Sequence, residues 1–144
     1  MGERAGTFAF LNTNGTTLTT GSIVPFRYVL GTGNLARNTN GGTVNLDSGT
    51  YIIAYSLGAT VPTAGSTVTI TPEYGGALHP EYARSFTVTA DGQSFELSDL
   101  LAITLSTDTS FSLNVTVTGG GTEPVTLTGV SASAIIYKVC DIIS

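Results

Sequence analysis

One short segment constrains the fold of this chain more than any other feature. Between Ser110 and Thr118 every odd position is apolar and every even position is polar. Successive side chains of a β-strand point to opposite faces, so this alternation predicts a strand with one face in a core and the other in water. Residues 7–10, 67–71 and 85–89 repeat the rhythm. The sequence therefore predicts an all-β fold.

Clusters of Gly, Pro, Asn and Asp lie between these runs and recur along the whole chain. Short strands separated by such turn signals are typical of a β-sandwich or barrel. Asp91-Gly92 suits the type I′ turn of a hairpin, because both central residues of that turn need a positive φ. We therefore expect residues 84–90 and 93–97 to form the arms of one hairpin. A frame shift of the apolar positions at Gly129 predicts a β-bulge.

Two segments, residues 51–55 and 134–140, are apolar on both faces. Such a strand must be covered on both faces, whereas the outer face of each sheet in a two-layer sandwich meets water. Most soluble oligomers are symmetric assemblies of one chain, so we expect another copy to cover the outer face. The candidate interface residues are Tyr51, Ile53, Tyr55, Ile135, Tyr137 and Val139.

The composition narrows the classes of function. The 144 residues suit one domain, and only 10% of them are charged, so Thr, Ser, Asn and Gly must cover most of the surface. A weakly charged polar exterior is typical of a protein outside the cytoplasm. The net charge is −5 and the cations are scattered, which argues against nucleic-acid binding. No apolar run is long enough for a membrane-spanning helix, so we expect no membrane insertion.

The usual catalytic sets cannot be assembled from this sequence. It holds one histidine, His79, and one cysteine, Cys140, and no second His or Cys supports a zinc site. The acidic residues stand mostly beside Gly, Ser or Thr, as turn residues do, and no segment supplies a calcium loop. We predict a non-enzymatic module without cofactor or metal, although a metal site shared across subunits stays open. Cys140 lies in an apolar run, so we expect it to be buried and slow to react.

The loop from Pro72 to Arg84 carries the candidate ligand-binding residues Tyr74, His79 and Tyr82. Aromatic side chains on loops held by a rigid scaffold commonly form recognition surfaces. We expect His79 itself to be a solvated surface residue. Replacing both tyrosines with Ala is expected to weaken ligand attachment and to leave assembly and the melting temperature nearly unchanged.

Four segments carry a resemblance that spans nearly the whole chain: residues 8–12, 24–26, 48–53 and 129–139. They contain an aromatic-rich opening strand, a Val-Pro-Phe step and a closing strand that ends in Lys-Val. In their order and spacing they resemble the C-terminal domain of the collagen-like exosporium glycoproteins of spore-forming bacteria, the BclA type. The resemblance implies a trimeric jelly-roll β-sandwich of the tumour-necrosis-factor and complement-globular-head type. It brings no catalytic residues.

The resemblance also sets the expected domains, location and partners. Residues 6–144 would form the head, and residues 1–5 would be the end of a collagen-like stalk or a new start. The partners would be other copies of the chain in a homotrimer, the stalk, and a surface glycan or host protein. The location would be extracellular, on a spore or cell surface. Loop 72–84 is longer than the family pattern, which leaves the ligand open.

Two other functions stay open at this point. Small trimeric β heads also form the receptor-binding tips of phage tail fibres, where they bind saccharides. A more remote alternative is a carbohydrate-active enzyme with a jelly-roll fold. Upstream Gly-X-Thr repeats would favour the spore stalk, an upstream baseplate-binding domain would favour the phage fibre, and a hydrolysis assay would test the enzyme.

Overall fold

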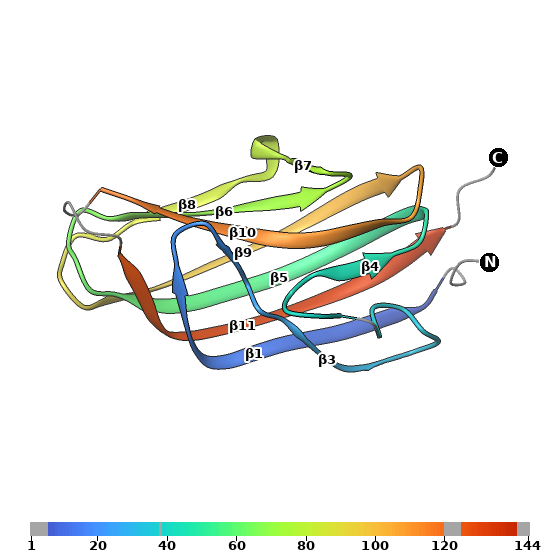
Figure 1. The fold of residues 1–144 in the computed structure, drawn as a ribbon, viewed down its shortest axis with the longest axis horizontal. Coiled ribbons are helices and arrows are strands. Elements are labelled where there is room, and N and C mark those ends of the chain that lie inside the picture. Colours follow the sequence, from blue (N-terminus) through green and yellow to red (C-terminus); the bar gives the residue numbers. More distant parts are fainter. Residues whose placement is uncertain (1–5, 38, 120–124, 141–144) are drawn as a thin grey trace.

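The computed structural model describes residues 6–37, 39–119 and 125–140, which form two β-sheets packed face to face (Figure 1). One sheet has five strands in the order β3-β1-β11-β5-β9. The other has six, with β2-β10-β6-β7 in a row, β4 beside β10 and β8 beside β6. The elements are β1 Phe8–Thr19, β2 Ser22–Ile23, β3 Arg27–Gly31, β4 Val44–Leu46, β5 Gly49–Val61, β6 Thr67–Tyr74, β7 Ala77–Leu78, the 3₁₀ turn η1 Pro80–Tyr82, β8 Arg84–Thr87, β9 Gln93–Leu105, β10 Thr109–Thr118 and β11 Thr126–Cys140.

The alternating segment that predicts the fold is β10, in the six-stranded sheet. Its odd-numbered residues Phe111, Leu113, Val115 and Val117 are buried between the sheets. Strand β10 pairs with β6 over its whole length except the first two residues, from Phe111 opposite Tyr74 to Thr118 opposite Thr67. The prediction of an all-β sandwich is confirmed.

The predicted hairpin around Asp91-Gly92 is wrong. Strand β8 joins β6 in the six-stranded sheet, whereas β9 joins β5 in the five-stranded sheet, so this turn carries the chain from one layer to the other. Gly92 does have a positive φ of 71°. Side chains hold the turn, because Asp91 Oδ1 accepts a hydrogen bond from the N–H of Ala64 and Gln93 Oε1 accepts one from the N–H of Thr89.

The predicted bulge lies where the frame shift placed it. The ladder between β11 and β5 changes register between Thr128 and Ser131, and Gly129 adopts a φ of 59°. After the bulge the even positions of β11 face the core, which buries Val130, Ala132, Ala134 and Ile136.

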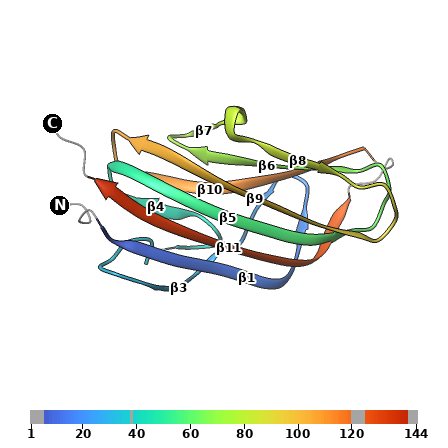
Figure 2. The same cartoon turned by 180° about the vertical axis from the view of Figure 1, so that it is seen from behind.

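The two doubly apolar segments are neighbouring strands at the centre of the five-stranded sheet, as Figure 2 shows for β5 and β11. Their inward side chains fill the space between the layers. One of them is a cation: Lys138 is fully buried, and its Nζ lies 5.9 Å from the ring centroid of Tyr51. A lysine stem packs as an apolar chain, and an ammonium group over an aromatic face is stabilised by the ring.

The two ends of the sandwich differ in what they carry. Phe8 pairs with Tyr137, so the start of β1 and the end of β11 lie at the same end. The loops at 62–66 and 88–92 lie together at the opposite end (Figure 1).

Candidate functional site

The outward face of the five-stranded sheet carries a continuous row of apolar side chains. Phe10 lies opposite Leu30 on β3 and opposite Ile135 on β11, and the row continues through Ala54 on β5 to Leu100 on β9. Leu100 is 65% exposed, the highest fraction among the large apolar residues of the described chain. A second row runs beside it, formed by Phe8, Tyr137, Ile52 and Ala102. These two rows are called the apolar patch below.

Half of the predicted interface residues do not belong to this face. Tyr51, Ile53 and Tyr55 are between 0% and 4% exposed, because the odd positions of β5 point into the core of the same chain. These three residues belong to the core and not to the interface. The even positions Ile52 and Ala54 take their place on the outward face.

The residues predicted on β11 do lie outward. Ile135, Tyr137 and Val139 are each between 41% and 48% exposed, on the face opposite to the core. The register of the ladder separates the two sets, because residues paired across strands share a face. Ile135 is paired with Ala54, so the outward positions of β5 must be even.

The same outward face becomes polar toward the opposite end of the sheet. The next two rows consist of Asn12, Ser133, Ser56 and Ser98, and of Asn14, Ser131, Gly58 and Glu96. All of these residues except Ser98 line a hollow of about 270 Å³, together with Phe10, Thr13 and Ala132. Arg27 extends the first polar row at the β3 edge, where it pairs with Asn12, and Glu96 lies at the β9 edge. The two edges of this face therefore carry opposite charges.

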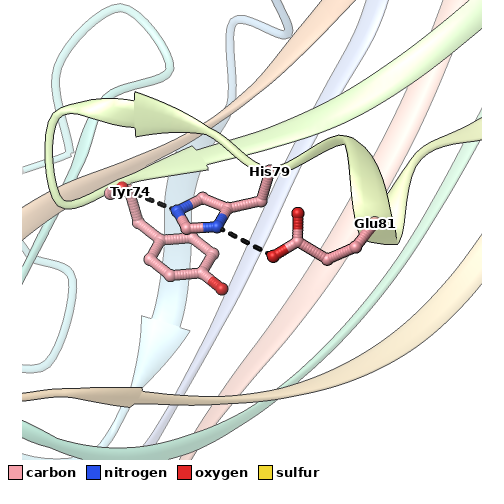
Figure 3. A network of polar contacts seen from close by, with 3 residues as sticks. All are labelled: Tyr74, His79 and Glu81. Carbon is pink, nitrogen blue, oxygen red and sulfur yellow. Dashed lines mark hydrogen bonds and ion pairs between the residues drawn. The ribbon is translucent and has the colours of Figure 1, made fainter.

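The second candidate site is the segment after β6, where three side chains meet (Figure 3). The His79 ring stacks on the Tyr74 ring with 3.7 Å between centroids and 6° between planes. His79 Nε2 lies 3.0 Å from the backbone oxygen of Tyr74, and Nδ1 lies 3.2 Å from Glu81 Oε2. The backbone N–H of His79 also donates to the oxygen of Pro72 at 2.9 Å.

The expectation of a solvated histidine is therefore wrong, because stacking and two polar contacts hold the ring. Tyr74 is only partly exposed, and whether it contacts a ligand stays a prediction. Phe111 lies against it at 6.2 Å between centroids, and Tyr74 packs on the hydrophobic core. Tyr82, at the end of η1, is half-buried, and whether it contacts a ligand stays a prediction.

A cavity of about 220 Å³ adjoins the stacked pair. Tyr74 and His79 form one wall, and the turn between β9 and β10 forms the other. The lining residues are Tyr74, Gly75, Ala77, His79, Thr104, Leu105, Ser106, Thr107 and Thr109, so hydroxyl groups and apolar carbons alternate and no carboxylate or lysine lines the wall. A small neutral ligand with hydroxyl groups matches that chemistry.

Electrostatics around the stacked pair favours an ionised carboxylate. The pKa of Glu81 is lowered, first by the hydrogen bond from its own backbone N–H and then by the hydrogen bond from His79. The pKa of Tyr74 is raised, mainly by burial and further by Tyr82 and Glu81. Glu81 is thus an acceptor and the Tyr74 phenol is neutral across the physiological range.

An ion pair ties the two layers together near this segment. Arg84 on β8 contacts Asp99 on β9 through two atoms, with Nε 3.0 Å from Oδ2 and Nη2 3.1 Å from Oδ1. Burial works to raise the pKa of Asp99, but hydrogen bonds from Arg84 and from the N–H of Leu100, with the Arg84 charge, lower it overall. Tyr55 lies opposite Asp99 in the ladder, and burial, followed by the Asp99 charge, raises its pKa to about 12.

Cys140 does not behave as expected from the apolar run around it. The ladder changes register between Lys138 and Cys140, and the cysteine is exposed at the end of β11. The inward position at this end is taken by Lys138 instead. The prediction of a buried thiol is wrong.

Neither a metal centre nor a membrane span is found in the described ranges. Within residues 6–37, 39–119 and 125–140, no three His, Cys, Asp or Glu side chains are close enough to hold a metal ion. Over the same residues, no helix has the length and apolar character to cross a bilayer.

Comparison with known proteins shows likeness in structure but not in sequence. No family model and no curated protein matches the chain. Among solved structures, the globular domain of zebrafish complement 1qA protein aligns with a TM-score of 0.63 and 10% identity, over 95% of this chain and 99% of that one. Murine APRIL aligns with a TM-score of 0.57 and 13% identity, over 90% and 98%. The vertex protein P5 of PRD1 aligns with a TM-score of 0.55 and 15% identity, over 95% and 99%.

These identities are low, so the likeness concerns the fold. The chain folds as a jelly-roll β-sandwich of the kind seen in the complement globular head and in APRIL, and it does so over nearly its whole length. The fold class predicted from the sequence is confirmed. The resemblance to the exosporium glycoproteins in particular stays a prediction.

Proposed function

We propose that this chain is the non-catalytic head of a surface protein, and that it assembles as a homotrimer through the outward face of its five-stranded sheet. The observation that carries the proposal is the apolar patch. Monomeric proteins rarely leave a large contiguous apolar surface in water, and patches of this kind mark interaction sites. Covering Leu100, Ile135, Tyr137 and their neighbours removes that surface from water.

The partner that fits this face is another copy of the chain. The patch contains no charged side chain, and the charges that flank the same face have opposite sign at its two edges, Arg27 on β3 and Glu96 on β9. A contact in which the β3 edge of one copy meets the β9 edge of the next is heterologous, and such contacts form a ring when the rotation from copy to copy closes. The ring size of three comes from the resemblance to the exosporium glycoproteins.

The finer function follows from the same resemblance. We place the head on a collagen-like stalk at a spore or cell surface, where it drives trimerisation and contacts a surface glycan or host protein. The start of β1 lies at the end of the sandwich opposite the loops 62–66 and 88–92, so a preceding stalk would leave those loops pointing away from it. Segment 72–84, on the other sheet, stays free of the proposed interface.

A second candidate function is a head at the tip of a viral fibre or spike. The likeness to the PRD1 vertex protein P5 favours it. The same trimer would serve both functions, so the assembly does not separate them. The sequence encoded upstream of this chain separates them: Gly-X-Thr repeats support the stalk, and a baseplate-binding or capsid-binding domain supports the viral head.

The test measures mass in solution with matched variants. Light scattering at micromolar concentration is expected to give three chain masses for the wild type. Leu100→Glu puts a carboxylate into the apolar patch and is expected to give one chain mass. Leu78→Glu is the control, because Leu78 is similarly exposed, at 54%, but lies on β7 in the other sheet. A wild-type protein that runs as a monomer would overturn the proposal, as would equal effects of the two variants.

A further inference from the structure

The contacts of His79 have a feature that a neutral imidazole cannot satisfy. Both ring nitrogens face acceptors, the backbone oxygen of Tyr74 and the carboxylate of Glu81. A carbonyl and an ionised carboxylate have no proton to donate, and a neutral imidazole carries only one N–H. Both contacts are therefore hydrogen bonds only when His79 is an imidazolium with a proton on each nitrogen.

We propose that His79 is a proton-operated latch that fastens residues 75–83 to β6. In the protonated state the ring donates to Tyr74 and Glu81 and lies as a cation on the Tyr74 face, an arrangement that adds a cation–π attraction. Loss of the proton leaves one nitrogen lone pair pointing at an acceptor, and the contact to the exposed Glu81 is the one that opens. Histidine is the side chain type that most often changes charge between about pH 5 and 8, so the test compares these two pH values.

Other groups near the ring keep their charge over that range. Glu81 on η1 is ionised throughout, since its pKa is lowered. Tyr74 on β6 carries a phenol that stays neutral at these pH values, since its pKa is raised. Tyr82 on η1 is the other phenol of this segment. The turn between β9 and β10, across the cavity, lines it with uncharged side chains, and the carboxylate of this turn, Asp108, accepts a hydrogen bond from the N–H of Ser48 instead. His79 is also the chain's only histidine, so a pH-dependent change in this segment has one source.

The latch controls a wall of the 220 Å³ cavity, because His79 and Tyr74 line it. When His79 is protonated, residues 75–83 are held against β6. When it is neutral, the contact to Glu81 is lost and the segment moves more freely. Control of ligand contact by pH rests on the proposed function, which assigns ligand contact to this segment. The latch itself rests on geometry within one chain.

Hydrogen exchange of backbone amides tests the latch without a ligand. The reporters are the N–H groups of Tyr82 and Ala83, which donate within the turn to the oxygens of His79 and Pro80. After correction for intrinsic exchange, and relative to amides in β5, their protection is expected to be about two- to fivefold higher at pH 5 than at pH 8, the effect of one surface ion pair.

Three variants make the result specific. His79→Phe keeps a flat ring on Tyr74 but has no N–H, and it is expected to lose the pH dependence. Glu81→Gln is expected to reduce it, while Glu96→Gln, a matched change on β9 made in the Leu100→Glu background, is expected to leave it unchanged. Equal protection at both pH values, or a pH effect that survives in His79→Phe, would overturn the proposal. The hydrogen-exchange measurement is repeated in the Leu100→Glu variant, which is expected to be monomeric. A failure of the latch can then be distinguished from a failure of the trimer.

Discussion

Tyr55 is a buried phenol that does not find a hydrogen-bond partner within the described part of the chain. Burial first, and then the charge of Asp99 beside it in the ladder, raise its pKa from 10 to about 12. A raised pKa means that the folded chain holds the proton more tightly than the unfolded chain does. This contribution to stability is complete below pH 10 and is lost as the pH rises toward 12.

The first prediction concerns this alkaline range. In urea titrations the free energy of unfolding of the wild type is expected to fall between pH 10 and 12. Tyr55→Phe removes the ionisable group and the unpaired hydroxyl together, so it is expected to be at least as stable as the wild type at pH 7 and to fall less above pH 10. The same alkaline loss in both proteins would show that other groups cause it.

The second prediction separates Tyr74 from Tyr82. Tyr74 lies between Phe111 and His79 and packs on the core, so Tyr74→Ala is expected to lower the free energy of unfolding by about 2 kcal/mol. Tyr82 is half-buried on η1 and stacks on no ring of the described residues, so Tyr82→Ala is expected to cost clearly less. Thermal unfolding of both variants measures the difference. Equal losses in the two variants would mean that the stack contributes little. Negligible losses in both would support the expectation that replacing both tyrosines leaves the melting temperature nearly unchanged.

At the scale of strands, the sequence predicts the elements well and their partners less well. Alternation located β10, and the shift of apolar positions at Gly129 located the bulge in β11, because both are local properties of one strand. The hairpin predicted at Asp91-Gly92 was wrong, because a turn residue indicates its own φ but not the sheet that the next strand joins. The assignment of the odd positions of β5 to the outward face was wrong for the same reason. Which side of a strand faces the core depends on the sheet that packs against it.

The third prediction belongs to the junction between the start of β5 and the end of β11. Gly49 has a φ of 151°, and a Cβ there would lie 2.7 Å from Cε of Lys138 and 2.9 Å from the backbone oxygen of Cys140. Gly49→Ala is therefore expected to destabilise the fold by about 2 kcal/mol or more, since a buried side chain and a backbone group must both move.

Gly58, in the middle of the same strand, provides the control. A Cβ there would meet its nearest atom at 3.4 Å, and its φ is outside the positive range, so Gly58→Ala is expected to change stability little. Chemical denaturation of both variants makes the comparison. Similar losses at the two positions would contradict the close packing of β5 against Lys138.

At the scale of the whole molecule, the sequence predicts that strands 51–55 and 134–140 need cover on both faces, and the structure supplies that cover on one face only. Which residues form the uncovered face depends on register across five strands, and no local pattern contains that information. The contacts of His79 were also out of reach from sequence, because they depend on the fold of η1 back onto β6.

The last prediction concerns how copies meet. In a ring of heterologous contacts, Arg27 at the β3 edge of one copy faces the β9 edge of the next, which carries Glu96. Arg27→Glu and Glu96→Arg are each expected to weaken association, because each places like charges across the contact. The double variant restores opposite charges and is expected to recover most of the lost affinity. Sedimentation equilibrium measures all four proteins. Additive losses in the double variant would mean that the two edges do not meet, even if the wild type is a trimer.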